Sequence, residues 1–376
     1  MATSLHLSRE VKVYVKFGDS IWEIPVLDGL SFSQGTNTAE VTLKEMADGS
    51  DVSRRGRLMF NDSLAPAEWS FSTYARPFKR SVDNIQHMAE EVLWAMMAGA
   101  ETSEYATGTD KFSNVIDMDG SRALIDFNSS NQMVFPTATI YFKFAANDGA
   151  ATGTDLWYEV QNATVNEVSA DFDIDGITTL NWSGGGTKIV EPSSAPTVTP
   201  IEVTATELQS TSNFIRNRLS QITVQANAGA TGTFPGAEAD GSYSLVLTGG
   251  SITISNNIEY VTPSSLGIVN VPLGHTAGTR SVSGTFTCYL DHATGSSADL
   301  LEDLLGSATS IKNSFALTLS VGGSGSTPRV EFIMPTAHLE IPTHSIEEVI
   351  SAEVNFHALP SDIAATDELT VKYVGA

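Results

Sequence analysis

Most of this chain consists of short segments in which apolar and polar residues alternate. The segments are rich in Val, Ile, Thr, Phe and Tyr, and Gly, Asn, Asp and Pro separate them. Alternation with a period of two, interrupted by turn residues, predicts antiparallel β-sheet. The expected strands include residues 11–17, 69–74, 138–144, 220–226, 244–247 and 315–321.

Two segments depart from this alternation and predict helices. In residues 81–98 the apolar side chains recur at helical spacing, with Ser81 as the expected N-cap and Gly99 as the expected stop. Residues 297–305 repeat the pattern on a smaller scale, after a capping-box serine at Ser296. We therefore expect one flanking helix in each half of the chain.

The length of 376 residues favours two domains. A proline-rich segment at 191–200 is the expected linker, because prolines disfavour pairing in a sheet and keep a connection extended. The chain then divides into a first domain at residues 1–190 and a second at residues 201–376.

Sequence features on the two sides of this linker recur in the same order. The matching segments are 26–32 with 246–252, 71–74 with 286–289, 135–138 with 334–337, and 167–171 with 348–353; the predicted helix starts at 81 and 296 also match. This order predicts two tandem antiparallel β-sandwiches, each with one helix, that arose by duplication. The alternative is that two similar sandwiches merely share common strand and turn sequences.

The composition favours a packed protein that does not bind nucleic acid directly. Hydrophobic residues make up 41% of the chain and charged residues 17%, and 20 Lys and Arg face 44 Asp and Glu for a net charge of −24. Phosphate binding depends on Lys and Arg, whereas a negative surface repels DNA. Cys288 is the single cysteine, so no intrachain disulfide is expected, and no run approaches the roughly 20 apolar residues of a membrane helix.

Three segments of the first half resemble tail tube proteins of long-tailed bacteriophages. They are Val-Leu-Asp-Gly at 26–29, Ser-Arg-Arg-Gly-Arg at 53–57 and Leu-Ala-Pro-Ala-Glu-Trp-Ser-Phe-Ser-Thr-Tyr-Ala-Arg-Pro at 64–77. The second half is less similar to the family. The resemblance implies a β-sandwich with one flanking helix and a long hairpin, whose inner sheet joins its neighbours into a ring around a lumen.

The resemblance also implies a structural virion protein that is made and assembled in the host bacterial cytoplasm. Most members of the family form rings of six chains, and some noncontractile tails build pseudo-hexameric rings from three duplicated chains. The repeat favours trimeric rings, with hexameric rings as the alternative. Expected partners are other copies in helically stacked rings, a tape measure protein, a tail terminator, and tail-tip or baseplate proteins. DNA would pass through the lumen without specific binding, and no membrane is involved.

An acidic strand is the first candidate site. Alternation places Asp171, Asp173 and Asp175 on one face, with Phe172 and Ile174 on the other. We expect the three aspartates to face the lumen, together with Glu353 in the second half; the alternative is an ordinary solvated outer face.

A basic group is the second candidate site. The basic residues gather in Arg54, Arg55 and Arg57, and in Arg76 and Arg80 with Lys79 between them. We expect the arginines to pair with carboxylates of a neighbouring subunit; a plain exposed loop is the alternative.

No motif in the chain predicts catalysis, a metal or a cofactor. The run 171–176 begins like a calcium loop, but Trp182 stands where a bidentate carboxylate is needed. The glycine-rich runs lack the ending of a phosphate loop, and Cys288 lies in a strand-like run. We therefore expect no enzyme activity. A surface binding or decoration module is the main alternative function, and a cell-wall hydrolase is the enzymatic one.

Overall fold

The computed structural model describes residues 10–41, 58–103, 105, 111–127, 134–145, 155–197, 210–227, 234–267, 269–306, 315–323, 325, 328–346, 349–363 and 365–375. The N-terminal half contains β1 (Val11–Phe17), β2 (Ser20–Ile24), β3 (Ser31–Val41), β4 (Leu58–Tyr74), β5 (Pro77–Lys79), β6 (Gln86–Met88), α1 (Glu91–Ala98), β7 (Ile116–Met118), β8 (Ala123–Asp126), β9 (Ala138–Phe144), β10 (Leu156–Asp173), β11 (Thr179–Gly186) and β12 (Lys188–Val190).

The C-terminal half begins with two 3-10 helices, Thr211–Asn213 and Asn217–Leu219. Its other elements are β13 (Gln221–Ala226), β14 (Ser242–Ser244), β15 (Leu247–Ser255), β16 (Ile258–Val261), β17 (Gly274–Ala277), β18 (Ser281–Tyr289), α3 (Ser297–Gly306), β19 (Phe315–Val321), β20 (Arg329–Leu339), β21 (Thr343–Ser345), β22 (Ser351–Ala358) and β23 (Thr370–Val374). The fold is mainly antiparallel β, as the alternating pattern predicted.

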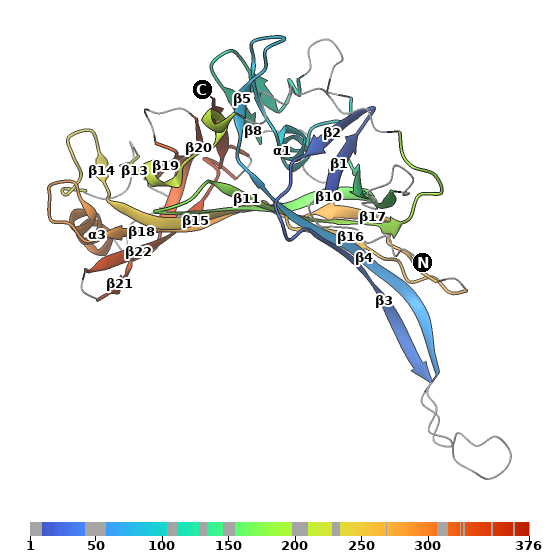
Figure 1. The fold of residues 1–376 in the computed structure, drawn as a ribbon. Helices are drawn as coiled ribbons and strands as arrows, with labels where there is room; N and C mark the ends of the chain where they lie inside the picture. The colour runs from blue at the N-terminus through green and yellow to red at the C-terminus, as the bar shows by residue number, and fades with distance from the viewer. Residues whose placement is uncertain are drawn as a thin grey trace.

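One sheet runs through both halves of the chain and is here called the main sheet. Its strands pair in the order β3, β4, β11, β10, β15, β18, β22 and β21. The halves meet where β10 pairs with β15, from Glu167 opposite Ser255 to Asp173 opposite Gly249. Figure 1 shows this sheet extending across the molecule, with β3 and β21 near its two ends. Backbone hydrogen bonds therefore join the halves in addition to the linker.

The hydrophobic core covers one face of the main sheet. Trp69, Phe71, Phe172, Trp182 and Phe286 point into it and are each at most 3% exposed. A second layer packs on this face, with β1, β2, β9 and α1 in the N-terminal half and β13, β14, β19 and β20 in the C-terminal half (Figure 1). Burying each such side chain contributes roughly 1.5–3 kcal/mol, so this face fixes the sheet in place.

The first predicted helix is wrong at its start. The structure has α1 at Glu91–Ala98, ending at the left-handed Gly99 as expected, while Gln86–Met88 form strand β6 opposite Pro77–Lys79. Asn84 has a positive φ of 62°, which a helix does not accommodate. Ile85 is partly buried and Met88 is buried beside this hairpin, and the spacing of the apolar residues imitated a helix.

Other expected elements compare well with the structure. The second helix is confirmed to within one residue, and the strands at 11–17, 138–144 and 315–321 are confirmed with the same bounds. The strand expected at 244–247 is wrong, because β14 ends at Ser244 and β15 begins at Leu247.

The strand pairings of the N-terminal half recur in the C-terminal half. In the N-terminal half β1 pairs with β2 and β9, while β10 pairs with β9, β11 and β12. In the C-terminal half β13 pairs with β14 and β19, while β20 pairs with β19, β22 and β23. The register recurs as well: Ser31 lies opposite Ser70 in one half, and Ser251 lies opposite Thr285 in the other.

Two of the sequence matches disagree with this recurrence. The match of 135–138 with 334–337 equated the start of β9 with part of β20, but the pairing order puts β19 in the place of β9 and β20 in the place of β10. The match of 167–171 with 348–353 equated β10 with the start of β22, but the pairing order puts β22 in the place of β11. Short runs of Val, Ser and acidic residues arise by chance in strands, which explains this second false match.

Candidate functional site

The face of the main sheet opposite the core carries small polar and acidic side chains, and it is here called the open face. Its positions follow from the alternation along each strand and the register between strands. They include Ser31, Ser33, Glu68, Ser70, Ser72, Glu167, Ser169, Asp171, Asp173, Thr179, Asn181, Ser183, Ser251, Thr253, Ser255, Ser281, Ser283, Thr285, Thr287, Tyr289, Thr343, Ser345, Ser351, Glu353, Asn355 and His357. None of these positions holds Lys or Arg.

The hairpin of β16 and β17 crosses one end of the open face. The ring of Tyr260 lies so close to Gly185 that a Cβ there would be 2.6 Å from the ring. The Tyr260 hydroxyl donates to the backbone oxygen of Asn162 at 2.7 Å. A groove of about 610 Å³ lies beside this crossing, lined by hydroxyl and glycine positions of β4 and β11.

Three of the four predicted acidic residues lie together on the open face. Asp171 and Asp173 are exposed on β10, and Glu353 is exposed on β22. Asp173 and Glu353 belong to one row across the sheet, with Gly249 and Thr287 between them. Neighbouring strands are about 4.8 Å apart, so the two carboxylates are separated by about 14 Å. The result is a negative surface spread over hydroxyl groups.

Asp175 lies outside the sheet, in the turn after β10. Its backbone N–H donates to Asp173 Oδ1 at 3.0 Å, and its carboxylate is 3.6 Å from the guanidinium of Arg218. Both partners of this ion pair are exposed to solvent, so the pair contributes little to stability.

The predicted basic residues divide into two groups. Arg54, Arg55 and Arg57 lie outside the described residues. Arg76 and Arg80 are 9% and 7% exposed, and both have contacts within the chain. Arg80 pairs with Asp83, and the guanidinium of Arg76 lies 5.5 Å from the centre of the Phe214 ring. Burial holds the pKa of Arg76 below its usual value, although Glu90 opposes the shift.

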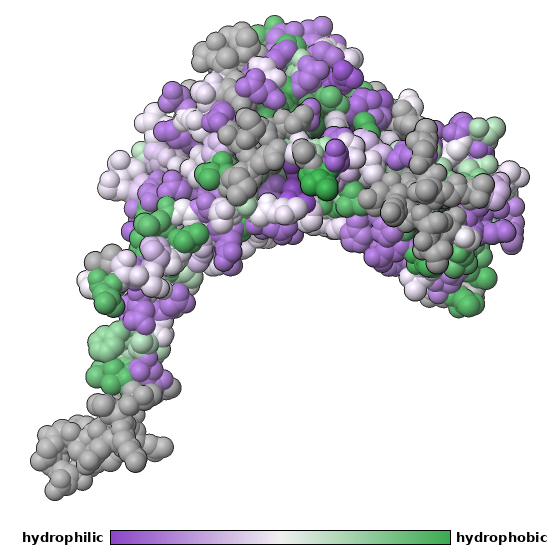
Figure 2. Space-filling model, turned by 180° about the vertical axis from the view of Figure 1, so that it is seen from behind, coloured by the Kyte–Doolittle hydropathy of each residue, from purple (hydrophilic) through white to green (hydrophobic). Residues whose placement is uncertain are grey.

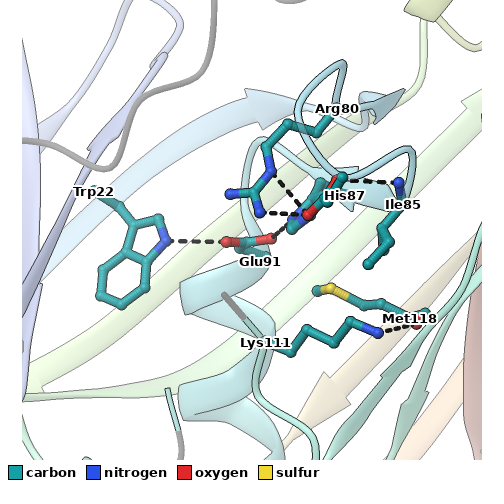
Figure 3. A network of polar contacts seen from close by, with 8 residues as sticks. Trp22, Arg80, Ile85, His87, Glu91, Lys111 and Met118 are labelled. Carbon is teal, nitrogen blue, oxygen red and sulfur yellow. Dashed lines mark hydrogen bonds and ion pairs between the residues drawn. The ribbon is translucent and has the colours of Figure 1, made fainter. Parts of the chain in front are cut away.

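A buried polar network ties the second layer together (Figure 3). Glu91 accepts a hydrogen bond from Trp22 Nε1 at 3.1 Å and lies 2.8 Å from His87 Nδ1. His87 Nε2 is 3.4 Å from Asp83, which also accepts from Arg80. Burial disfavours the charged imidazole, but the hydrogen bond and charge of Glu91 raise the pKa of His87 above its usual value. The network fixes β2 and the β5–β6 hairpin against α1.

The neighbouring Glu90 is fully buried and joins the two halves. Tyr373 of β23 donates to Glu90 Oε1 at 2.9 Å and accepts from Trp94 Nε1 at 2.9 Å. Burial raises the pKa of Glu90 to about 7, against the lowering effect of Tyr373 and Arg76. Sequence reasoning missed this carboxylate and Glu91. The available signal was two adjacent acidic residues inside an otherwise apolar run from 88 to 98.

The arrangement defines the class of antiparallel β proteins: the main sheet has one buried face, one polar face without Lys or Arg at the positions named above, and two terminal strands. The family model for the phage tail tube protein matches residues 93–358, which is more than half of the chain, and the chain belongs to this family. It is 28% identical over 376 residues to the tail tube protein pb6 of Escherichia phage T5, covering 97% of this chain and 75% of the relative. Its role is therefore that of a structural component of a phage tail.

The described part of the chain adds two observations. Within it, no helix is long and apolar enough to cross a membrane. The described side chains also include no group of three or more His, Cys, Asp or Glu that could hold a metal ion.

Proposed function

We propose that copies of this chain join through the ends of the main sheet into rings, and that the stacked rings form a tube with the open face toward its lumen. One observation carries this proposal: a single sheet runs through the chain with a core on one face and acidic and hydroxyl side chains on the other. A lumen that conducts DNA requires a wall without cations, since Lys and Arg would bind its phosphates. Asp171, Asp173 and Glu353 would repel the passing polyanion.

The ends of the main sheet support assembly. Within the described residues, β3 pairs only with β4, and β21 pairs only with β22. Each terminal strand thus presents a row of backbone N–H and C=O groups along its outer side, and such edges favour pairing with another chain. Heterologous contacts of this kind generate rings when the rotation between subunits closes.

The recurrence of strand pairings supports rings of three chains. If each half is one copy of a duplicated domain, divided near residues 191–200, three chains supply six equivalent units around the ring. A ring of six chains is the alternative. Duplication would also favour assembly by mass action, because fewer chains must meet to close a ring.

The projecting hairpin supports contacts between stacked rings. β3 and β4 extend beyond the body of the molecule, and apolar residues lie on this extension (Figure 2). Leu58, Met59 and Phe60 at the end of its described part are 60%, 59% and 60% exposed. Contiguous exposed apolar groups of this kind mark interaction surfaces. A neighbouring ring is the proposed occupant.

The remaining proposed partners are those expected of a phage tail tube protein. A tape measure protein would fill the tube before DNA does, and a terminator and tip proteins would close its ends. DNA would pass without specific binding, and we expect no catalytic activity. The predicted pairing of Arg54, Arg55 and Arg57 with a neighbouring subunit remains part of this proposal, whereas the buried Arg76 and Arg80 are expected to act within the chain.

Negative-stain electron microscopy of the purified protein tests the proposal. Tubes or stacked rings are the expected result, and the mass per ring then distinguishes three chains from six. A protein that stays monomeric at high concentration would contradict the proposal and favour a binding or decoration module.

A further inference from the structure

We infer that β21 of one chain pairs with β3 of the next in a fixed register, with Ser345 opposite Ser31, Thr343 opposite Ser33 and Ile341 opposite Gly35. The inference rests on the proposed function, because it names the contact between neighbouring chains. It adds the partner strands and their alignment, which the family membership does not supply.

The template for this contact lies within the chain, where β10 meets β15. Asp171 lies opposite Ser251, and Glu167 lies opposite Ser255. This junction joins the last strand of the main sheet in the N-terminal half to the first strand in the C-terminal half. A contact between chains would join the last strand of the C-terminal half, β21, to the first strand of the N-terminal half, β3.

The correspondence between strands fixes the residues. Phe71 lies opposite Trp182, and the matching Phe286 lies opposite Val354, so β22 takes the place of β11. Asp171 lies opposite Thr179, three residues before Trp182. Ser345 lies opposite Ser351, three residues before Val354, so Ser345 takes the place of Asp171.

An irregularity in the register supports this alignment. β10 contains one extra residue relative to β11 between Val165 and Glu167. β20 and β21 together contain one extra residue relative to β22, because Leu339 lies opposite Phe356 and Thr343 lies opposite Glu353. The two halves therefore share a bulge at the same point of the same strand pairing. Such an agreement is not expected if the similar pairing order arose by chance.

Ser31 takes the place of Ser251 in the same way. Ser31 lies opposite Ser70 on β4, and Ser251 lies opposite Thr285 on β18, the strand that contains Phe286. Transferring the pair of Asp171 and Ser251 therefore gives Ser345 opposite Ser31. Because the side-chain period of a strand is two, this register keeps the open face continuous between chains, and a slip of one residue would bury it.

The chemistry of the two terminal strands agrees with the transferred register. Residues 31–35 and 343–345 contain no charged residue of the kind that protects natural sheet edges. On the core side, Phe172 packs against Gly250 at the internal junction, where a Cβ would be 2.7 Å from the ring. The corresponding pair between chains is Ile346 with Leu30, in which Ile346 is smaller than Phe172 and Leu30 is larger than Gly250. Ile346 is 81% exposed in the single chain, and this contact would cover it.

Cysteine cross-linking of assembled tubes tests the register. The variants are Ser31→Cys with Ser345→Cys, and Ser33→Cys with Thr343→Cys, each confirmed to form tubes by negative stain. The matched control, Ser33→Cys with Ser345→Cys, represents a slip of two residues on the same face. Directly opposite Cβ atoms are about 5 Å apart and diagonal ones about 7–8 Å apart, so a short thiol cross-linker distinguishes them.

The double variant Asp171→Cys with Ser251→Cys calibrates the cross-linker. Its two cysteines lie directly opposite each other within one chain, so they must link without forming oligomers. The native Cys288 is 1% exposed, and the unmodified protein gives its background. We expect both matched pairs to convert most of the monomer into covalent oligomers and the slipped pair to stay near background.

Two different failures can be distinguished. If tubes form but the slipped pair links, or if neither matched pair links while the calibration pair does, the register is wrong and the proposed function stands. If the unmodified protein forms no tubes or rings, the proposed function fails and the register fails with it.

Discussion

Glu90 shows at the residue scale what the sequence did not reveal. Its carboxyl is fully buried between α1 and β23 and is held by Tyr373. By contrast, the common face of Asp171 and Asp173 followed directly from their spacing of two, because a strand must place them on one side. Glu353 shares that face, although it was assigned by a false match. The two acidic residues inside an apolar run indicated burial, but no local pattern identifies a partner that lies 283 positions away.

Replacement of Glu90 by Gln tests the buried carboxyl. Its folded pKa of about 7 exceeds the ordinary value of 4.5, so the contribution of Glu90 to folding stability is highest at low pH and falls as pH rises between these values. The full loss is on the order of 3 kcal/mol. Glu90→Gln removes this loss, so thermal unfolding should show its stability relative to the parent increasing from pH 4.5 to 7.

The control for this experiment is Asp19→Asn, in the exposed turn between β1 and β2. Its stability relative to the parent should not change over the same pH range. A pH-independent difference for Glu90→Gln would contradict a carboxyl that is protonated on burial.

Charge reversal on the open face is the second test at the residue scale. Phage carrying Asp171→Lys, Asp173→Lys and Glu353→Lys should assemble tails of normal length but eject DNA more slowly, because the added cations bind its phosphates. Asp19→Lys, on the second layer, is the matched control. Normal ejection kinetics measured by dye release from the triple variant would place these residues away from the DNA path.

At the scale of elements, alternation located most strands, and helical periodicity misled once. The segment 85–88 was assigned to a helix because its apolar residues recurred at helical spacing, but residues 86–88 form a buried strand that pairs with β5. In the structure, the positive φ of Asn84 interrupts a helix at this point, and the helical spacing of the apolar residues did not indicate it. The single main sheet was not predicted either, since the pairing of β10 with β15 joins segments from different halves.

The hairpin of β3 and β4 gives a test at the scale of an element. Met59→Asp with Phe60→Ser should leave rings intact and abolish long tubes, because the exposed apolar end would no longer be favourable to bury in a neighbouring ring. Asn61→Ser on the same strand is the control and should leave tube length unchanged. Tubes of normal length from the double variant, seen by negative stain, would assign stacking to another surface.

At the scale of the whole molecule, the net charge of −24 and the repeated pairing order lead to the same account. The negative charge lies partly on a sheet face that has no Lys or Arg at its described positions. The same sheet ends in two strands, β3 and β21, whose residues 31–35 and 343–345 include no Lys, Arg, Asp or Glu. The sequence predicted the tube class and the acidic face from resemblance and alternation. It could not predict that the two halves share one continuous sheet, because strand pairing between distant segments depends on the folded chain.

Electron cryomicroscopy of assembled tubes, at a resolution that separates strands, tests the central claim most directly. The account predicts a wall in which the main sheet continues from chain to chain, with Asp171, Asp173 and Glu353 facing the lumen. A tube whose wall is formed by other strands, or whose main sheet turns its open face outward, would contradict it.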